Sequence, residues 1–391
     1  MNRTLANSIS GAGKVLERPK YKRAVTLLSM SSENSRPGIS RRNLFKIGGG
    51  VVAATILGSG TYAYLHRGAS VQLERLGISL PKALNPLPAP PADPALEVEK
   101  LSTLFTPNDK FFIIDNAVVV PQVDTASWKL TIDGMVKNPI TLSYDDLLSR
   151  PMIEVDDTIA CVSNWVGGPY VGNARWLGVR LDDLINEAKP SRDADQIMSH
   201  SVDDFTAGFP TATLDGRDAI IAVGMNGEVL PVKNGFPARL IVPGLYGYVS
   251  ATKWLSRLEL TRFDLKQGYW IKKGWAKFAP IKMQSRIDTP YVEETFAAGK
   301  RAIAGVAWAH NVGIERVEVK IDWDQWREAN LGPELNNTTW RQWWLDWDVQ
   351  PGKHKIQVRA VNKKGDIQTS VKKDVLPNGA QGWHTITVFA E

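Results

Sequence analysis

A single cysteine, Cys161, occurs among the 391 residues of this chain. A lone thiol cannot form an intrachain disulfide, so the fold must be stable without covalent cross-links. The thiol can instead be a small buried hydrophobe, a nucleophile or a soft ligand for a metal. Sequence rich in glycine and asparagine follows it at once, with Asn164, Gly167 and Gly168. The role of this one side chain therefore bears directly on function.

Positive charge is concentrated at the start of the chain. The whole chain has a formal net charge of +6, and its first 46 residues hold ten lysines and arginines against two glutamates. Residues 47–391 are therefore slightly acidic, with a net charge of −2. This distribution predicts no basic face that follows nucleic-acid phosphates, and we expect no nucleic-acid partner.

A twin arginine, Arg41-Arg42, stands shortly before an uncharged stretch of 19 residues at 47–65 that is rich in glycine and alanine. This pattern is typical of a twin-arginine signal, which exports folded proteins across a bacterial membrane. The stretch is also nearly long enough to span a bilayer, and no small-residue cleavage site follows it. We predict that residues 1–70 are a twin-arginine signal or an N-terminal membrane anchor, and that the protein is periplasmic. Met30 is the expected true start, because it brings the twin arginine close to the N-terminus.

The next two regions differ in texture. Residues 71–100 include a proline-rich stretch and predict a stiff linker, with ordered structure from near Leu101. Residues 101–275 mix short strands and short helices without regular βαβ alternation, which predicts an α+β domain. The expected strands are 111–114, 118–120, 128–132, 219–223 and 239–242, and the expected helices follow Ser143 and cover 180–188.

Residues 280–391 predict an immunoglobulin-like β-sandwich. Apolar and polar residues alternate strictly at 317–323, 356–360 and 386–388, and turn residues separate these stretches. A dense aromatic run lies among them: Trp340, Trp343, Trp344 and Trp347. We expect these rings to pack in the core and between domains, and a partner or dimer surface is the alternative.

Familiar catalytic motifs are missing from the sequence. The five histidines are far apart and show no paired metal-ligand spacing. No Cys-x-x-Cys-His motif occurs, so we expect no covalently bound haem in this chain. The segments 161–178 and 234–254 remain as candidates. Arg239 and Lys253 offer a fork and a point charge for a phosphate, and a thiolate at the other end of a large polar cofactor could bind a soft metal.

Three ordered motifs carry a resemblance to a known family. They are Cys161-Val-Ser-Asn164, Asn173-Ala-Arg-Trp-Leu-Gly-Val, and Gly235-Phe-Pro-Ala-Arg239 continued by Ser250-Ala-Thr-Lys-Trp. Over residues 101–391 the chain resembles the sulfite oxidase family of molybdopterin-dependent oxidoreductases, in an exported bacterial form without a haem domain. The resemblance implies that the β-sandwich is of that family's molybdenum-cofactor dimerisation type, and hence a homodimer.

The resemblance also implies the site. A single molybdopterin would carry molybdenum, with Cys161 as the catalytic residue and the metal ligand of the protein. The other implied cofactor contacts are Asp115, Asn164, Arg175, Asn234, Arg239, Ser250, Thr252 and Lys253. Oxygen-atom transfer to a small-molecule substrate would need a separate electron-transfer protein or membrane redox partner.

Three positions depart from the family pattern. Where sulfite oxidases carry arginines, this chain has Ile113-Ile114, Trp165-Val166 and His310. A doubly charged oxyanion would lose its partners there, and desolvating it unpaired is costly. The departures favour an uncharged or bulkier substrate, such as an S-oxide, over a sulfite-like oxyanion. The expected substrate pocket comprises Trp165, Tyr170, Tyr246, Tyr248 and His310. The alternative function is a non-catalytic cofactor- or ligand-binding cell-surface protein that uses the β-sandwich.

Overall fold

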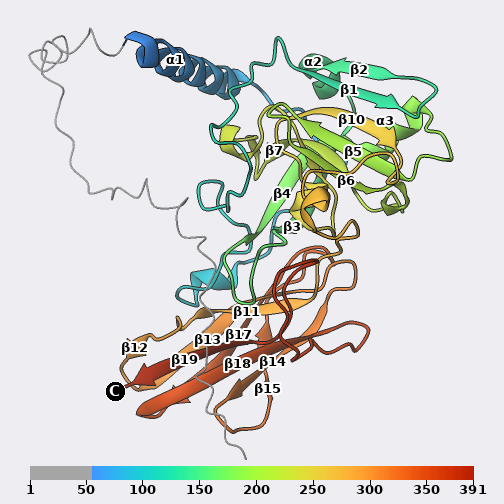
Figure 1. Cartoon of the computed structure of the whole chain (residues 1–391). Helices are drawn as coiled ribbons and strands as arrows, with labels where there is room; N and C mark the ends of the chain where they lie inside the picture. Colours follow the sequence, from blue (N-terminus) through green and yellow to red (C-terminus); the bar gives the residue numbers. More distant parts are fainter. Residues whose placement is uncertain (1–54) are drawn as a thin grey trace, which may run out of the picture. The chain divides into compact units, whose positions relative to one another are not determined.

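The computed structural model describes residues 55–391, so the predicted twin-arginine motif and Met30 lie outside the described residues. Residues 61–391 form one compact unit. Helix α1 (Thr55–Gly77) begins the described part of the chain (Figure 1), and the predicted boundary at residue 70 falls inside this helix. The Tyr64 hydroxyl in α1 donates to the carbonyl of Val120 at 3.1 Å. Within residues 55–391, no helix is long and apolar enough to cross a membrane.

The first sheet has the order β2-β1-β10-β5-β6. Its strands are β1 (Lys129–Gly134), β2 (Ile140–Ser143), β5 (Gln196–Ser201), β6 (Thr206–Pro210) and β10 (Leu255–Thr261). β1 runs parallel to β10, and the other neighbours are antiparallel. The short helices α2 (Tyr144–Leu148) and α3 (Leu181–Ala188) share its hydrophobic core. Both helices were predicted from their sequence, and Ser143 caps α2 in a capping box with Asp146.

The second sheet supplies the scaffold of the site. Its strands are β3 (Met152–Ala160), β4 (Val171–Arg180), β7 (Ile220–Met225) and β8 (Glu228–Val229), in that order, with β9 (Arg239–Ile241) paired to β7. β3 and β4 are antiparallel, and β3 ends directly before Cys161. The predicted strands at 219–223 and 239–242 are thus confirmed as β7 and β9. The remaining α-helix is α4 (Gly247–Ser250), and single 3₁₀ turns are η1 (Pro94–Leu96), η2 (Thr211–Thr213), η3 (Val232–Asn234) and η4 (Ile271–Lys273).

Residues 284–390 form two further sheets. One has the order β11-β13-β17-β16, with β11 (Gln284–Thr289), β13 (Gly299–Trp308), β16 (Asn330–Leu331) and β17 (Arg341–Val349). The other has the order β12-β19-β18-β14-β15, with β12 (Thr295–Phe296), β14 (Ile314–Ile321), β15 (Arg327–Glu328), β18 (Gly352–Asn362) and β19 (His384–Ala390). Side chains of both sheets meet in one hydrophobic core, so the two sheets pack as a β-sandwich. An immunoglobulin-like strand order stays a prediction.

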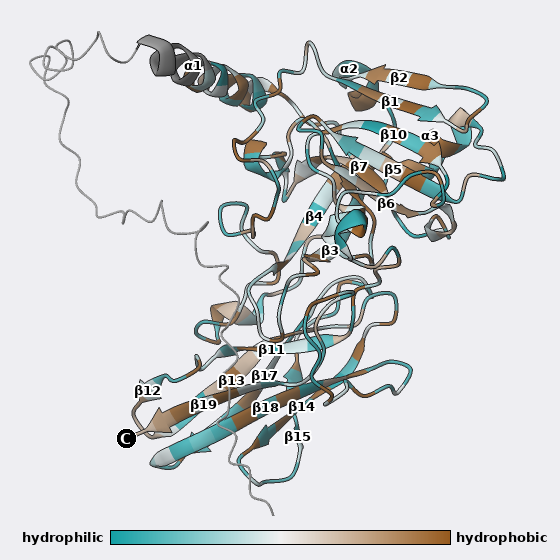
Figure 2. Cartoon of the chain, in the orientation of Figure 1, coloured by the Kyte–Doolittle hydropathy of each residue, from teal (hydrophilic) through white to brown (hydrophobic). Residues whose placement is uncertain are grey.

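The alternation of apolar and polar residues that predicted these strands arises because one face of each strand is buried in the core. In β14, Val317, Val319 and Ile321 are buried, whereas the residues between them are partly exposed. Hydrophobic and hydrophilic residues accordingly occur along the same strands of the sandwich (Figure 2). Trp343 is fully buried in this core, and Trp340 instead packs with residues of the Cys161 region. Trp343 therefore packs in the core of the sandwich, and Trp340 packs between the sandwich and the Cys161 region, as we expected for these rings.

Two strand predictions are wrong. Residues 111–114 and 118–120 belong to no sheet in the described part of the chain. Phe111 packs edge-on against Trp176 of β4, with 5.8 Å between ring centroids. This contact accounts for an apolar residue at position 111. Val118 is completely exposed. A short apolar run does not by itself distinguish a strand from an irregular segment.

The proline-rich segment is not a free spacer. The Leu87 amide donates to the Glu154 carboxylate at 2.8 Å. The Asp93 carboxylate accepts from the Leu104 amide and from the Gln342 side chain, each at 2.7 Å. Order therefore begins well before Leu101, because polar groups of the segment are paired with the body rather than with water.

Candidate functional site

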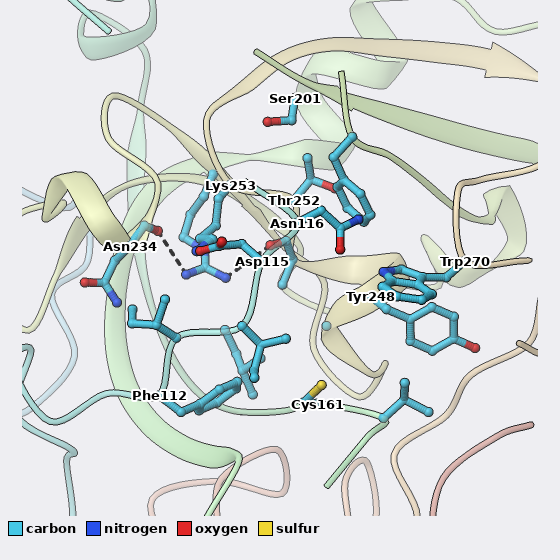
Figure 3. A pocket seen from close by; sticks show the side chains of 18 of the residues that line it. Phe112, Asp115, Asn116, Cys161, Ser201, Asn234, Tyr248, Thr252, Lys253 and Trp270 are labelled. Atoms are coloured by element: carbon cyan, nitrogen blue, oxygen red, sulfur yellow. Dashed lines mark hydrogen bonds and ion pairs between the residues drawn. The ribbon is translucent and has the colours of Figure 1, made fainter. Parts of the chain in front are cut away.

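A cavity of about 280 Å³ holds Cys161 together with residues from five other segments. The lining residues that carry the argument are Phe112, Asp115, Asn234, Arg239, Tyr248, Thr252, Lys253, Trp270 and Trp275. In Figure 3 the sulfur of Cys161 lies apart from the polar group of Asn234, Asp115 and Lys253, and Tyr248 and Trp270 lie to one side. The cavity thus has a thiol region, a polar region and an aromatic wall.

The loop between β3 and β4 presents the thiol. The Cys161 amide donates to the Tyr170 carbonyl at 2.9 Å, and the Tyr170 amide donates to the Asn164 side-chain oxygen at 2.9 Å. These bonds close the loop, so the half-buried sulfur has a fixed position 2.9 Å from the Ser163 hydroxyl. Burial raises the pKa of the Cys161 thiol. A bound cation would therefore be needed to hold it as a thiolate at neutral pH.

Arg239 supplies a buried cation in the polar region. It is 5% exposed and donates to the carbonyls of Asn234 at 3.0 Å and Ala251 at 3.2 Å. Its Nε has no hydrogen-bond partner among the residues that the structure describes. Burial lowers the pKa of Arg239 to about 9, and the charge of Asp157 only partly opposes this effect. A guanidinium with a spare donor in a cavity is suited to an anion from outside the protein.

Lys253 adds a second cation beside Arg239. Its ammonium forms an ion pair with Asp115 and donates to the Lys233 carbonyl at 3.2 Å. Burial lowers the pKa of Lys253, and the Asp115 carboxylate opposes that change. Near these groups, the Asn234 side-chain oxygen is buried and has no partner in the described structure. The polar region therefore contains one donor and one acceptor that the protein itself leaves unused.

Gly235 allows the backbone to bring these groups together. Its φ is +114°, in a region that favours glycine, and a Cβ there would lie 3.0 Å from both Cα and Cβ of Lys253. The Trp254 amide donates to the Gly235 carbonyl at 3.3 Å, and the Leu240 amide donates to the Thr252 carbonyl at 2.9 Å. Glycine is thus required where the turn after η3 passes the segment that carries Lys253.

These observations fit a phosphorylated cofactor that carries a metal. The unpartnered polar atoms of Arg239 and Asn234 lie in the same cavity as a soft thiol. Arg239, Lys253 and Asn234 would hold the polar part of such a group, and Cys161 would bind its metal. Molybdopterin has both chemical features, so the residues present fit the cofactor that the family resemblance implies.

Three of the implied cofactor contacts lie outside the cavity lining. The Arg175 guanidinium forms a two-pronged ion pair with Asp156, with N–O distances of 2.7 and 2.8 Å. The Ser250 hydroxyl donates to the carbonyls of Leu245 and Tyr246 around α4. Asn164 closes the Cys161 loop, as described above. These polar groups are satisfied by the protein, which explains why they do not face the cavity.

The expected substrate pocket is also revised. Of its five residues, only Tyr248 lines the cavity. Trp165 is 52% exposed on an outer groove, and Tyr170 packs edge-on against it. Tyr246 is buried, which raises the pKa of its hydroxyl to about 12. His310 is buried with Nε2 2.7 Å from the Thr158 carbonyl, and burial lowers its pKa to about 4.

Several lining residues were missed by sequence reasoning. They are Asn116, Ser163, Ser201, Asp203, Phe205, Trp270 and Trp275. The two tryptophans stand in a lysine-rich run after Gly268, and this unusual composition could have marked them as candidate site residues. Ser163 stands in the Cys161-Val-Ser-Asn164 motif, but it was not singled out there. The other four come from segments with no motif, and only the folded structure brings them close to Cys161.

The fold and the site define a molybdopterin-binding protein, and comparisons support this class. Residues 117–270 match the family described as "Oxidoreductase molybdopterin binding domain". The uncharacterized oxidoreductase YuiH of Bacillus subtilis (strain 168) is 31% identical over 152 residues, which cover 39% of this chain and 74% of YuiH. Human mitochondrial sulfite oxidase is 26% identical over 343 residues, covering 73% of this chain and 61% of that enzyme.

The chain belongs to the sulfite oxidase family of molybdopterin-dependent oxidoreductases. It spans about three fifths of the length of the mammalian sulfite oxidases that it matches. Among solved structures, the sulfane dehydrogenase SoxCD from Paracoccus pantotrophus superposes with a TM-score of 0.65 at 22% identity, covering 81% of this chain and 93% of that one. This similarity establishes a shared fold.

Proposed function

We propose that the chain reduces an uncharged S-oxide by oxygen-atom transfer at a Cys161-ligated molybdenum cofactor. One observation supports the choice of substrate over sulfite. Among the cavity-lining residues that the structure describes, the only cations are Arg239 and Lys253, and both lie in the polar region. The rest of the lining includes Phe112, Ile113 and Trp270. A dianion would lose its hydration there without gaining a charged partner, whereas a neutral S-oxide would not.

When bound, molybdopterin supplies a metal that exchanges two electrons and accepts an oxygen atom. The protein residues have supporting roles. Cys161 provides a thiolate ligand, and Arg239 and Lys253 neutralise the anionic part of the cofactor. Phe112 and Tyr248 narrow the space for substrate.

Tyr248 has no role as a proton donor in this proposal. Its hydroxyl donates to the Ala276 carbonyl, and burial raises the pKa of Tyr248. The hydroxyl therefore keeps its proton and its orientation. The two protons consumed in forming water would come from solvent that reaches the cavity.

The proposal includes a compartment and an electron source. Reduction of one S-oxide consumes two electrons and two protons and yields a sulfide and water. The electrons would come from a separate redox protein. Export by the twin-arginine route, with or without a retained anchor, would place the reaction outside the cytoplasmic membrane.

The test is metal analysis followed by a substrate comparison. Protein from a molybdenum-supplied host should contain about one molybdenum per chain. Reduced methyl viologen should be oxidised with dimethyl sulfoxide as acceptor, and ferricyanide should be reduced poorly with sulfite as donor. A chain without molybdenum would contradict the enzyme proposal. A higher kcat/KM for sulfite would reject only the substrate.

A further inference from the structure

Lysines gather on one surface beside the aromatic wall of the cavity. Segments 270–282 and 371–382 carry six of them, Lys272, Lys273, Lys277, Lys282, Lys372 and Lys373, and a single acid, Asp374. The two segments are joined, because the Ala276 amide donates to the Pro377 carbonyl at 2.9 Å and Lys282 donates to the Asn378 side chain at 2.8 Å. We call this region the lysine surface.

The lysine surface is unbalanced in charge. Within residues 55–391, lysines that form ion pairs with carboxylates include Lys100, Lys253, Lys266 and Lys363, and none of the six lysines does so. Five of the six are exposed. Residues 47–391 have a net charge of −2, so this positive region contrasts with the rest of the body. Such asymmetry favours an acidic partner.

Apolar side chains lie among the lysines. Phe278, Val371 and Leu376 are each more than half exposed. Lys277 lies 5.0 Å from the centroid of the Phe278 ring and covers part of it. Apolar residues within a charged rim are typical of protein interfaces that form transiently.

A chain of aromatic rings connects this surface with the cavity. Tyr269 is 40% exposed, and its ring centroid lies 5.1 Å from that of Trp270. Trp270 lies 6.4 Å from Trp275, and Trp275 lies 5.9 Å from Tyr248. Trp270, Trp275 and Tyr248 line the cavity that holds Cys161. The lysine surface is therefore next to the reaction site.

We infer that the lysine surface docks a small acidic protein that carries one electron at a time. This inference rests on the proposed function, which needs a separate source of two electrons for each S-oxide. Two reduced partner molecules would dock in turn, and each would give one electron. An anionic membrane would also be attracted to lysines, but it would have no need of an aromatic connection to the cavity.

The test uses a matched pair of probes and does not require an active cofactor. The probes are cytochrome c with succinylated lysines, which is acidic, and unmodified cytochrome c, which is basic. Binding to the full chain is measured by isothermal titration calorimetry at about 20 and 200 mM salt. The acidic probe should bind, the basic probe should not, and salt should weaken binding about tenfold or more.

Charge reversal locates the surface. The variant with Lys272→Glu, Lys273→Glu and Lys277→Glu should weaken binding of the acidic probe at least about tenfold. The control variant with Lys300→Glu, Lys353→Glu and Lys355→Glu changes exposed lysines of β13 and β18 and should stay within about twofold of the unchanged chain. Circular dichroism checks that both variants are folded.

Three binding outcomes overturn the inference. They are an acidic probe that does not bind, equal weakening in both variants, and binding of vesicles with 30% phosphatidylserine in place of the acidic probe. Carbodiimide cross-links to the acidic probe that all fall outside the lysine surface also reject it. Because the probes bind the surface and not the metal, a chain without molybdenum would still give a clear answer.

Discussion

The Arg239 guanidinium carbon lies 5.0 Å from the centroid of the Trp176 ring, which covers a cation that forms no ion pair within the described residues. The Trp176 ring gives some cation–π stabilisation, but an aromatic face does not replace a carboxylate. The arrangement is therefore costly without an anion in the cavity, and it becomes favourable when one binds.

Arg239→Met should separate these two effects. Methionine keeps much of the volume and removes the desolvated charge, so the cofactor-free protein should be as stable as the unchanged chain or about 1 kcal/mol more stable. Cofactor content should fall at least about tenfold. Thermal unfolding of cofactor-free protein and fluorescence of the extracted pterin measure the two quantities. Arg257→Met removes partly exposed ion pairs with Asp133 and Glu259 and is the control, with unchanged pterin content expected.

Gly235→Ala should destabilise the fold more than Gly216→Ala. Both glycines have positive φ, +114° and +94°, so both substitutions carry a conformational cost of about 1–2 kcal/mol. At Gly235 the added Cβ would also lie 3.0 Å from Lys253, whereas at Gly216 no described atom lies within 4 Å. Urea unfolding should give an additional loss of about 1 kcal/mol or more for Gly235→Ala. Equal losses would mean that the polar region adapts freely to the methyl group.

Sequence reasoning identified regular elements better than irregular ones. The capping box at Ser143 and the apolar spacing of α3 are local patterns, and both helices occur where they were predicted. The Phe111–Ile114 run has the composition of a strand, but its backbone joins no sheet within residues 55–391. Its side chains line the cavity, and Phe111 packs against Trp176 of β4. Apolar composition does not determine strand pairing, because the hydrogen-bond partners of a strand are distant in sequence.

The candidate site was predictable only in part, because local motifs can be read from the sequence but side-chain orientation cannot. Cys161, Arg239 and Lys253 stand in recognisable motifs, and the structure brings them to one cavity. Asn164 and Ser250 stand in the same motifs, but their polar groups bind backbone atoms nearby. A motif shows that a residue type is needed at a position. It does not show whether the side chain contacts a ligand or holds the loop that presents one.

Cys161→Ser should abolish turnover and leave the fold intact. The sulfur contacts Ser163 within a loop that backbone bonds and Asn164 already hold, so little packing is lost. A serine hydroxyl is a harder and less acidic ligand than a thiol. Dimethyl sulfoxide reduction should fall at least about 100-fold, and the melting midpoint should shift by less than about 3 °C. Ser163→Ala is the control and should keep most activity. Turnover retained in Cys161→Ser would remove the assigned role.

His384 should make the protein sensitive to acid. Its Nδ1 accepts the Ile287 amide at 2.9 Å, so the ring is neutral in the fold, and burial lowers the pKa of His384 to about 4. The unfolded chain, with a pKa near 6.5, binds more protons between pH 6.5 and 4. The contribution of neutral His384 to the free energy of unfolding is therefore fully present above pH 6.5. It is lost as pH falls, by up to about 3 kcal/mol at pH 4.

The substitution His384→Asn tests whether His384 causes the acid sensitivity. His384→Asn keeps a side-chain acceptor that does not titrate, so the slope of unfolding free energy against pH should decrease between pH 6.5 and 4. His354→Asn is the matched control. Its pKa is raised in the fold, where it pairs with Asp322, so removing it should not reduce the acid sensitivity. An unchanged slope in His384→Asn would show that other groups cause the acid loss.

Ile113→Arg should shift the substrate preference toward sulfite. Ile113 lines the cavity and is 39% exposed, so an arginine there can keep its guanidinium solvated until an anion arrives. A new cation would compensate the desolvation of sulfite and give a neutral S-oxide no comparable gain. The ratio of kcat/KM for sulfite to that for dimethyl sulfoxide should rise about tenfold or more. Ile113→Met changes the side chain without adding charge and should leave the ratio near its original value. If both variants change the ratio equally, shape and not charge selects the substrate.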